Sequence, residues 1–180
     1  MATKADIRRV VKAARQAMTP DERAAASRRI ATRLLSRSDL AAAQTVLLYA
    51  ALPDEPDTLE LVSRFAAQGS RVLLPTVVGD DLWLRVYTTP QESVVGAFGI
   101  TEPTGPRFTD FAAIDWVLVP GVAFSPGGQR LGRGRGYYDR LLCHPDFAGV
   151  KKVGCAFSYQ LFPALPTEPH DILMDDVVTD

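Results

Sequence analysis

Residues 116–142 read WVLVPGVAFSPGGQRLGRGRGYYDRLL, and this stretch decides the fold that the sequence predicts. Trp116–Val119 is a short apolar run, typical of a buried strand, and Pro120-Gly121 ends it. The turn Ser125–Gly128 and a glycine-rich loop follow, and the loop leads into a helix that we expect over 137–143. Strand, turn, glycine-rich loop and helix in this order indicate an α/β site for a nucleotide or another phosphate-bearing ligand.

The loop itself supplies groups that suit phosphate. Its glycines alternate with larger residues, so the backbone can approach a ligand closely. Its arginines add fixed positive charge and bidentate hydrogen bonds, which a polyanion requires. The loop is neither a Walker A sequence nor a GxGxxG fingerprint. On residue chemistry alone, a flexible surface loop and an RNA-binding patch therefore stay open as alternatives.

The composition is that of an ordinary globular chain, with 180 residues, 47% of them hydrophobic and 23% charged. This length suits one domain, spanning 1–180, with a substantial core. The net charge is −1, but the basic residues gather in the first 37 positions. Such a basic segment is either a solvated helix face or a contributor to anion binding.

Cysteine use and hydropathy bear on the compartment. Cys143 and Cys155 have no CxxC or histidine spacing, so we expect neither a disulfide framework nor a zinc site. Two isolated thiols fit a reducing, cytoplasmic environment. No apolar run is long enough for a membrane span, and the charged N-terminus does not read as a secretion signal. We expect no association with a membrane.

Apolar periodicity predicts two helices at the start of the chain, over 4–17 and 20–36. Thr19 and Glu22 form a capping box in front of the second helix, and Pro20 occupies its first position. In the first helix, Lys4 and Arg8 lie one turn apart on a single face. Without further information, these two basic side chains are simply solvated.

Apolar runs over 45–49 and 71–75 predict buried strands, joined by a helix over 58–68 and therefore parallel. A hairpin-like strand over 82–87 is expected after the turn at Gly79-Asp80. The further strands that we expect lie over 116–119, 151–157 and 174–178. This order of elements predicts a three-layer α/β fold with a mostly parallel open sheet.

An acidic loop, 50–58, follows the first strand. It lies at the carboxyl end of that strand, where ligands of open α/β sheets bind. By default, Asp54, Glu55 and Asp57 are turn and cap residues. Asp57 or Thr58 is expected to cap the helix that follows.

The runs Val119-Pro-Gly-Val-Ala-Phe124 and Arg130-Leu-Gly-Arg-Gly-Arg-Gly-Tyr-Tyr-Asp-Arg140 together resemble the signature of the 5-formyltetrahydrofolate cyclo-ligases, also called methenyltetrahydrofolate synthetases. A match of this length is far more specific than a lone GxGxxG. The resemblance extends sparsely over nearly the whole chain. It implies an open Rossmann-like fold, of the kind shared with sugar-phosphate isomerases and CoA-transferases.

The resemblance also implies an activity: an ATP- and Mg²⁺-dependent ligase of folate one-carbon metabolism. Such an enzyme cyclises 5-formyltetrahydrofolate, with or without a polyglutamate tail, to 5,10-methenyltetrahydrofolate and releases ADP and phosphate. Phosphorylation turns the formyl oxygen into a leaving group that N10 can displace. Catalysis of this kind relies on positioning and on stabilising charge. No nucleic-acid partner is implied.

The family pattern assigns roles to particular residues. For ATP it implies Lys4, Arg8, Arg130, Leu131, Gly132, Arg133, Gly134, Arg135, Gly136, Tyr137 and Tyr138. For the folate it implies Ala50, Glu55, Arg133, Gly134, Arg135, Gly136 and Tyr137. The predicted catalytic residues are Arg130, Arg133 and Arg135, which would stabilise charge on the transferring phosphoryl group. The implied ligands of Mg²⁺ are Asp139 and Asp171, since this ion needs few carboxylates when phosphate and water complete its shell.

Some positions leave the assignment open. Many relatives have a basic residue where Thr76 stands and an acid where Ser125 stands, so no ligand role is predicted for either. Gly99–Pro103 resembles the family's G-I-x-E-P turn, in which Glu102 is either structural or part of the site.

Two other classes of function stay open. A non-catalytic nucleotide- or RNA-binding module would use the basic N-terminus and the glycine loop, although Asp139 and Asp171 would repel phosphate without a metal. A sugar-phosphate enzyme would use the same architecture without ATP.

Overall fold

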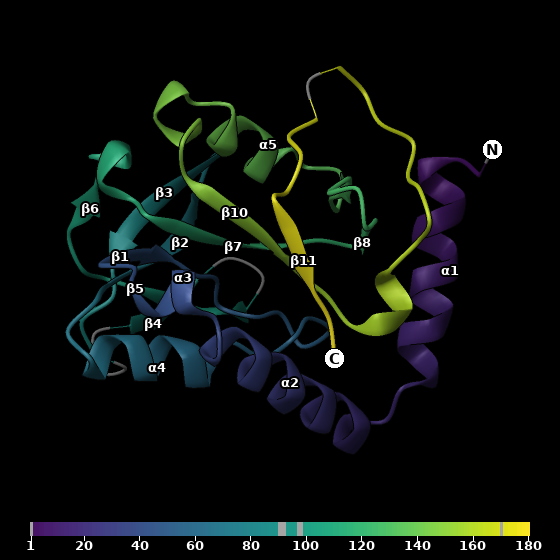
Figure 1. Cartoon of the computed structure of the whole chain (residues 1–180), viewed down its shortest axis with the longest axis horizontal. Helices are drawn as coiled ribbons and strands as arrows, with labels where there is room; N and C mark the ends of the chain where they lie inside the picture. The colour runs from purple at the N-terminus through teal and green to yellow at the C-terminus, as the bar shows by residue number, and fades with distance from the viewer. Residues whose placement is uncertain (1, 90–92, 97–98, 170) are drawn as a thin grey trace.

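Figure 1 shows the computed structural model, which describes residues 2–89, 93–96, 99–169 and 171–180. A seven-stranded sheet forms its centre, in the order β11-β10-β7-β1-β2-β3-β6. Neighbouring strands from β11 to β2 pair in parallel, whereas β3 and β6 pair antiparallel at one edge. The strands of this sheet are β1 Thr45–Leu47, β2 Arg71–Val78, β3 Asp81–Val86, β6 Arg107–Phe108, β7 Trp116–Pro120, β10 Lys151–Cys155 and β11 Asp176–Val178.

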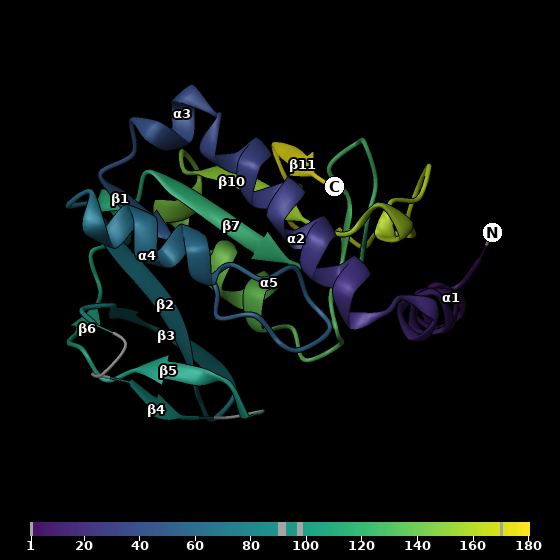
Figure 2. The same cartoon turned by 90° about the horizontal axis from the view of Figure 1, so that it is seen from below.

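Helices cover both faces of the sheet (Figure 2). On one face, α2 and α4 place Ile30, Leu34 and Phe65 against the strands. On the other face, α5 and the short helix η3 place Leu141 and Phe147 against them. The expected three-layer α/β fold is confirmed. The helices are α1 Lys4–Ala17, α2 Pro20–Leu35, α3 Ser38–Ala41, α4 Leu59–Ala67 and α5 Tyr137–Leu142, with short 3₁₀ helices η2 Phe111–Ala113, η3 Pro145–Phe147 and η4 Ser158–Gln160.

The two long N-terminal helices begin where their caps dictate. Thr19 and Glu22 form the expected capping box before α2, and Thr3 with Asp6 forms another before α1. Each box satisfies backbone N–H groups that a helix leaves without partners at its start. Neither helix departs from its predicted range by more than its final residue.

The observed strands match their predicted ranges less closely than the helices do. The ends of a strand are set by its pairing with neighbouring strands rather than by the local sequence pattern. The first strand stops at Leu47, short of the predicted end at residue 49. The second continues to Val78, beyond the predicted end at residue 75, because its far half pairs with β3. The predicted turn at Gly79-Asp80 joins these two strands.

Two small hairpins lie outside the main sheet: β4 Ser93–Val95 with β5 Thr101–Pro103, and β8 Ala123–Phe124 with β9 Arg130–Leu131. The second corrects the sequence interpretation, which placed Arg130 in a bare loop. Ser125 closes the turn of this hairpin, because its hydroxyl accepts from the backbone N–H of Gln129 at 3.2 Å and donates to the side chain of the same residue at 2.9 Å.

The first helix packs on neither face of the sheet. Figure 1 shows α1 beyond the end of the sheet at which β7 and β11 point, beside β8. Ile7 and Val11 pack there against Ala123, Leu131 and Leu165, in a cluster separate from the two main cores. The basic face of α1 is thereby brought to the carboxyl ends of the strands.

In the described ranges, no helix is both long enough and apolar enough for a membrane span.

Candidate active site

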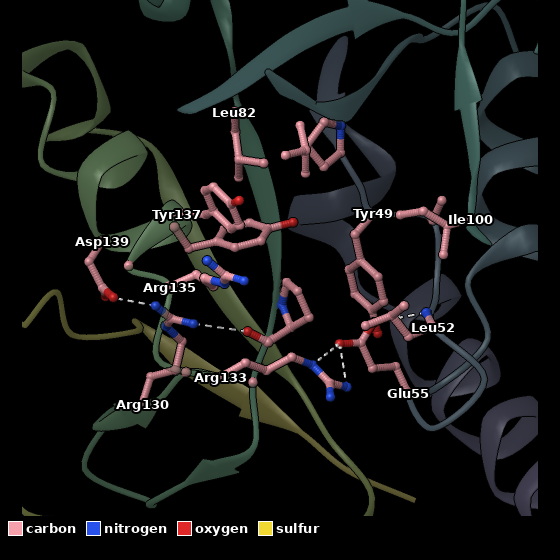
Figure 3. A pocket seen from close by; sticks show the side chains of 18 residues that line it. Tyr49, Leu52, Glu55, Leu82, Ile100, Arg130, Arg133, Arg135, Tyr137 and Asp139 are labelled. Atoms are coloured by element: carbon pink, nitrogen blue, oxygen red, sulfur yellow. Dashed lines mark hydrogen bonds and ion pairs between the residues drawn. The ribbon is translucent and has the colours of Figure 1, made fainter. Parts of the chain in front are cut away.

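A cavity of about 400 Å³ opens at the carboxyl ends of β1 and β7 (Figure 3). The chain adds β2 on one side of β1 and β10 on the far side of β7, so the strand order reverses between these two central strands. Loops that leave neighbouring strands in opposite directions open a crevice at such a point. We call this space the larger cavity.

One wall of the larger cavity is apolar. It is formed by side chains from β2, β3 and the segment before β5, namely Pro75, Val77, Leu82 and Ile100. The facing side is built by the glycine loop and the start of α5, where Figure 3 shows Arg130, Arg133, Arg135 and Tyr137 directed to the same space. A ligand here meets hydrocarbon on one side and guanidinium groups on the other.

Glu55 supplies a buried carboxylate to this cavity. Its side chain is 8% exposed, and one oxygen accepts from the backbone N–H of Leu52 at 3.0 Å. The other oxygen accepts from Nη2 and Nε of Arg133 at 3.0 and 3.2 Å. Burial raises the pKa of Glu55, although these hydrogen bonds and the Arg133 charge oppose the rise. The site thus holds a strong acceptor in a largely apolar place.

The three predicted catalytic arginines are not equivalent. Arg130 is 5% exposed, and its guanidinium donates to Asp139 at 2.7 Å and to the carbonyl of Pro120 at 3.2 Å. Arg133 is paired with the acidic loop. Within the described part of the chain, the exposed Arg135 side chain makes neither a hydrogen bond nor an ion pair. Arg130 is therefore fixed, whereas Arg135 is available to an incoming anion.

Glycine is required at two points of this loop. Gly134 has a φ of +103° and Gly136 a φ of +69°, values that L side chains rarely adopt. At Gly136 an added Cβ would also lie 2.9 Å from the guanidinium of Arg140. Gly134 places the chain beside Arg8 of α1, whose guanidinium donates to the carbonyl of Gly132 at 3.0 and 3.2 Å. The first helix is therefore in direct contact with the glycine loop through Arg8.

A second cavity, of about 200 Å³, lies between α1 and this loop. Its described lining contains four cationic side chains and one acid, which are Arg8, Lys12, Arg15, Arg133 and Asp54. We call it the smaller cavity. It shares Gly121 and Arg133 with the larger cavity, so the two spaces are neighbours with Arg133 between them.

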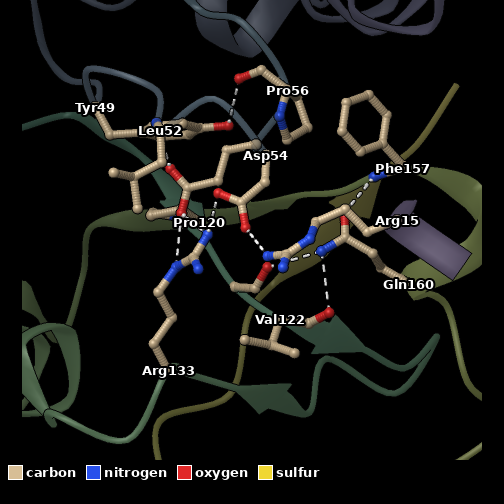
Figure 4. A network of polar contacts seen from close by, with 12 residues as sticks. Arg15, Tyr49, Leu52, Asp54, Pro56, Pro120, Val122, Arg133, Phe157 and Gln160 are labelled. Carbon is tan, nitrogen blue, oxygen red and sulfur yellow. Dashed lines mark hydrogen bonds and ion pairs between the residues drawn. The ribbon is translucent and has the colours of Figure 1, made fainter. Parts of the chain in front are cut away.

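Asp54 links the two sides of the smaller cavity (Figure 4). One carboxylate oxygen accepts from Arg133 at 2.8 Å, and the other accepts from Arg15 of α1. Burial alone would raise the pKa of Asp54, but the hydrogen bonds and charges of Arg133 and Arg15 outweigh it, so this pKa is lowered. Neighbouring carboxylates, Asp54 and Glu55, thus have opposite pKa shifts.

The other implied site residues are distributed as follows. Ala50, Gly132, Gly136 and Tyr138 line the larger cavity. Leu131 is buried in the cluster under α1, so its side chain does not face either cavity. Lys4 lies at the start of α1, where its ammonium group donates to Glu168 at 3.0 Å and to Asp171 at 3.3 Å. Lys4 and Asp171 are in contact with each other, but neither is among the residues that line the two cavities.

The residues fit a magnesium ion in part. Among the described residues, no three His, Cys, Asp or Glu side chains gather closely enough to hold a metal. Mg²⁺ that arrives with phosphate needs only one or two carboxylates. Asp139 meets that need, since it lines the larger cavity beside the arginines and uses one of its oxygens for Arg130.

Two residues that the sequence left unassigned have structural roles, and a third lies on the face of its strand that is turned away from the larger cavity. Glu102 is buried, and its carboxylate accepts from the backbone N–H of Val77 at 3.3 Å, tying β5 to β2. Ser125 holds the β8–β9 turn. Thr76 lies between two cavity residues on β2, so strand alternation directs its side chain to the opposite face, where its hydroxyl is buried and has no hydrogen-bond partner among the described residues.

Sequence reasoning missed the apolar wall and most of the smaller cavity. One signal for the latter was present: Lys4, Arg8, Lys12 and Arg15 are spaced four, four and three residues apart, which places them along one face of a helix. Asp54 gave no local signal beyond that of a turn residue. The apolar wall is composed of ordinary strand residues that only the sheet brings together.

A ligand for the larger cavity must bring negative charge to the arginines and an apolar part to the opposite wall. The fold and the site thus define an open-sheet α/β protein with a cavity that suits an anionic, partly apolar ligand. The sequence profile of the 5-formyltetrahydrofolate cyclo-ligase family matches residues 1–180, so the chain belongs to this family of enzymes.

Individual relatives agree with this assignment. The chain is 32% identical to the 5-formyltetrahydrofolate cyclo-ligase of Escherichia coli K12 over 176 residues, which cover 94% of this chain and 96% of the relative. It is 33% identical over 143 residues to the enzyme of the same name from Mycolicibacterium smegmatis, with 76% and 73% covered.

Solved structures agree as well. The 5,10-methenyltetrahydrofolate synthetase of Aquifex aeolicus superposes with a TM-score of 0.84 at 36% identity, covering 97% of this chain and 88% of that one. The synthetase of Mycoplasma pneumoniae gives a TM-score of 0.79 at 22% identity, with 99% of both chains covered, and supports the fold. Membership of this family favours the enzyme over the two alternative classes, the RNA-binding module and the sugar-phosphate enzyme.

Proposed function

We propose that this chain catalyses the ATP-dependent cyclisation of 5-formyltetrahydrofolate to 5,10-methenyltetrahydrofolate, with release of ADP and phosphate. The observation that carries the proposal is the larger cavity, in which a buried carboxylate and three arginines face an apolar wall at the switch point of the sheet. A reduced folate has the matching parts: a fused ring system with N–H donors and a formyl oxygen on which charge develops.

The folate binds in the larger cavity. Its ring system packs on Pro75, Val77 and Leu82, while the carboxylate of Glu55 accepts hydrogen bonds from the amino and ring N–H groups. Because Glu55 is buried, such hydrogen bonds form away from competing water and fix the orientation of the ring. Ala50 has too small a side chain to offer more than shape and backbone groups.

The polyphosphate of ATP binds along α1 and the glycine loop. Lys4, Arg8 and Arg133 supply fixed positive charge there, and the smaller cavity adds the charge of Lys12 and Arg15. Arg133 borders both cavities, so it stands where the two substrates meet. Arginine suits that place, since its guanidinium donates several hydrogen bonds in a plane.

The chemistry transfers the γ-phosphoryl group of ATP to the formyl oxygen. N10 then attacks the formyl carbon, and the phosphorylated oxygen leaves as phosphate. Arg133 and Arg135 stabilise the charge on the transferring group, and Arg130 holds Asp139 and the loop in position. Preorganised donors of this kind commonly account for a large part of the rate enhancement.

Mg²⁺ is part of the proposal. Asp139 would hold it, with Asp171 assisting from the C-terminal segment, and the ion would neutralise phosphate charge. Asp171 lies outside both cavities in an ion pair with Lys4, so it would reach the ion only after releasing Lys4. A cytoplasmic location fits the free thiols, Cys143 and Cys155.

The test is an assay of the purified chain with 5-formyltetrahydrofolate and MgATP, following the methenyl chromophore in the near ultraviolet. We expect the chromophore to appear with equimolar release of ADP, and not to appear when ATP is omitted. Product formation without ATP, or ATP hydrolysis without product, would contradict the proposal.

A further inference from the structure

Asp54 contacts two guanidinium groups from distant parts of the chain. Its partners, Arg15 and Arg133, lie 39 and 79 residues away in sequence. One belongs to α1 and the other to the glycine loop. The carboxylate therefore joins the acidic loop to both elements that border the smaller cavity (Figure 4).

The acidic loop does not need this side chain for its own conformation. The turn is closed by Glu55, whose backbone N–H donates to the carbonyl of Leu52 at 3.0 Å and whose side chain accepts from the N–H of the same residue. Asp57 caps α4 by accepting from the N–H of Leu59 at 2.9 Å. Within the described part of the chain, the Asp54 carboxylate bonds only to Arg15 and Arg133.

The pair of acids gives Arg133 two anchors. Nη2 of Arg133 donates to both Asp54 and Glu55, at 2.8 and 3.0 Å. A substrate that hydrogen-bonds to Glu55 competes with Arg133 for the carboxylate oxygens. It therefore weakens the contact between Arg133 and Glu55. Asp54 faces the smaller cavity instead, and so keeps its hold on Arg133 when the larger cavity fills.

We propose that Asp54 is a positioning residue, which holds Arg133 at the boundary between the two cavities and ties α1 to it through Arg15. This inference rests on the proposed function, because the proposed function places Arg133 where the two substrates meet. Asp54 touches no reacting atom and acts through Arg133. Its loss should therefore lower turnover while the fold and the other loop contacts persist.

The test compares Asp54→Asn with Asp57→Asn, the same chemical change three residues away in the same loop. Asn retains the capping role of Asp57, so that control should keep wild-type activity. We expect Asp54→Asn to lose about 10- to 100-fold in kcat/KM, the range for a lost charge-assisted hydrogen bond. Its melting temperature should stay near that of the wild type, and Asp54→Glu should recover part of the activity.

A double variant separates positioning from a general structural role. If Asp54 acts through Arg133, then Arg133→Gln with Asp54→Asn should be no slower than Arg133→Gln alone. Independent, multiplying losses would overturn the proposal, as would Asp54→Asn activity within twofold of wild type. If the wild type and the Asp57→Asn control were both inactive, the proposed function would fail rather than the role of Asp54.

Discussion

The two cavities share Arg133 and Gly121, yet they differ in almost every other respect. The larger lies at the switch point of the sheet and combines an apolar wall with the buried Glu55. The smaller lies between α1 and the glycine loop, and four of its lining side chains are cationic. One edge of one sheet therefore offers two chemically distinct sites, because different elements close each of them.

Two acids that are adjacent in the sequence, Asp54 and Glu55, line different cavities. Glu55 faces the larger cavity, where burial raises its pKa, while Asp54 faces the smaller one, where Arg133 and Arg15 together overcome burial and lower its pKa. A displacement of one residue along the loop thus exchanges a largely apolar environment for one rich in cationic side chains. Arg133 contacts both acids and couples the sites.

The largest effect should follow removal of the shared residue. Arg133→Gln deletes the charge that borders both cavities, so affinity for both substrates and the rate of transfer should fall. We expect kcat/KM to drop about 100- to 1,000-fold, as when a preorganised donor to the transition state is lost. Steady-state kinetics with each substrate varied in turn would measure it.

The matched control is Arg64→Gln, an exposed arginine on α4 whose side-chain partner is Glu60. This variant should behave as wild type. An Arg133→Gln enzyme within fivefold of wild type would mean that the shared boundary has no part in catalysis.

The next effect should be confined to the larger cavity. Glu55→Gln keeps the size of the side chain but replaces one acceptor oxygen by a donor, so the dissociation constant of the folate should rise about 10- to 150-fold. Affinity for an ATP analogue should stay nearly constant, and calorimetry with each ligand would compare the two. The opposite pattern, with ATP binding weakened and folate binding spared, would assign Glu55 to the other site.

A further change tests the arginine side of the larger cavity. Asp139→Asn should lower turnover about 10- to 100-fold at low Mg²⁺, because a charged ligand of the ion is lost, and excess Mg²⁺ should restore part of it. A Mg²⁺ titration of turnover measures this. If no concentration of Mg²⁺ restored turnover, Asp139 would not be a ligand of the ion. Its role would then be to hold Arg130 through their ion pair.

The smallest effect concerns pH. Glu55 must be ionised to accept from the folate, and its pKa lies above its ordinary value of 4.5, so folate affinity should weaken as pH falls through that raised pKa. The pKa of Asp54 lies below 3.8, so ATP affinity should persist to lower pH. In Arg133→Gln the acid limb for folate should move to higher pH, because a charge that favours the ionised Glu55 is gone.

The same shifts have opposite consequences for stability. The folded chain binds a proton at Glu55 more tightly than the unfolded chain does, so this contribution to stability is lost as pH rises through the raised pKa. Asp54 stabilises the fold at pH values above the pKa that it has in the unfolded chain. This stabilisation is lost as the pH falls through the lowered pKa of Asp54 in the folded chain. If the affinities for folate and for ATP fell over the same pH range on acidification, the assignment of Glu55 and Asp54 to different sites would be contradicted.

The sequence by itself determined the features that depend on near neighbours in the chain. Capping boxes set where α1 and α2 begin, apolar runs mark the central strands, and glycine alternates with arginine in the loop before α5. The signature around that loop identified the family. Each of these signals is contained within a few residues, so no knowledge of long-range packing was needed.

Only the tertiary structure decided which of these parts meet. Arg130 is a fixed partner of Asp139 in a hairpin strand, Lys4 lies with Asp171 rather than in either cavity, and Asp54 joins two arginines far away in sequence. Such contacts arise because β-α-β winding brings the carboxyl ends of separate strands to one edge and packs α1 against it. A charged residue in a loop forms an ion pair with a residue distant in sequence only when the fold brings the two side chains together.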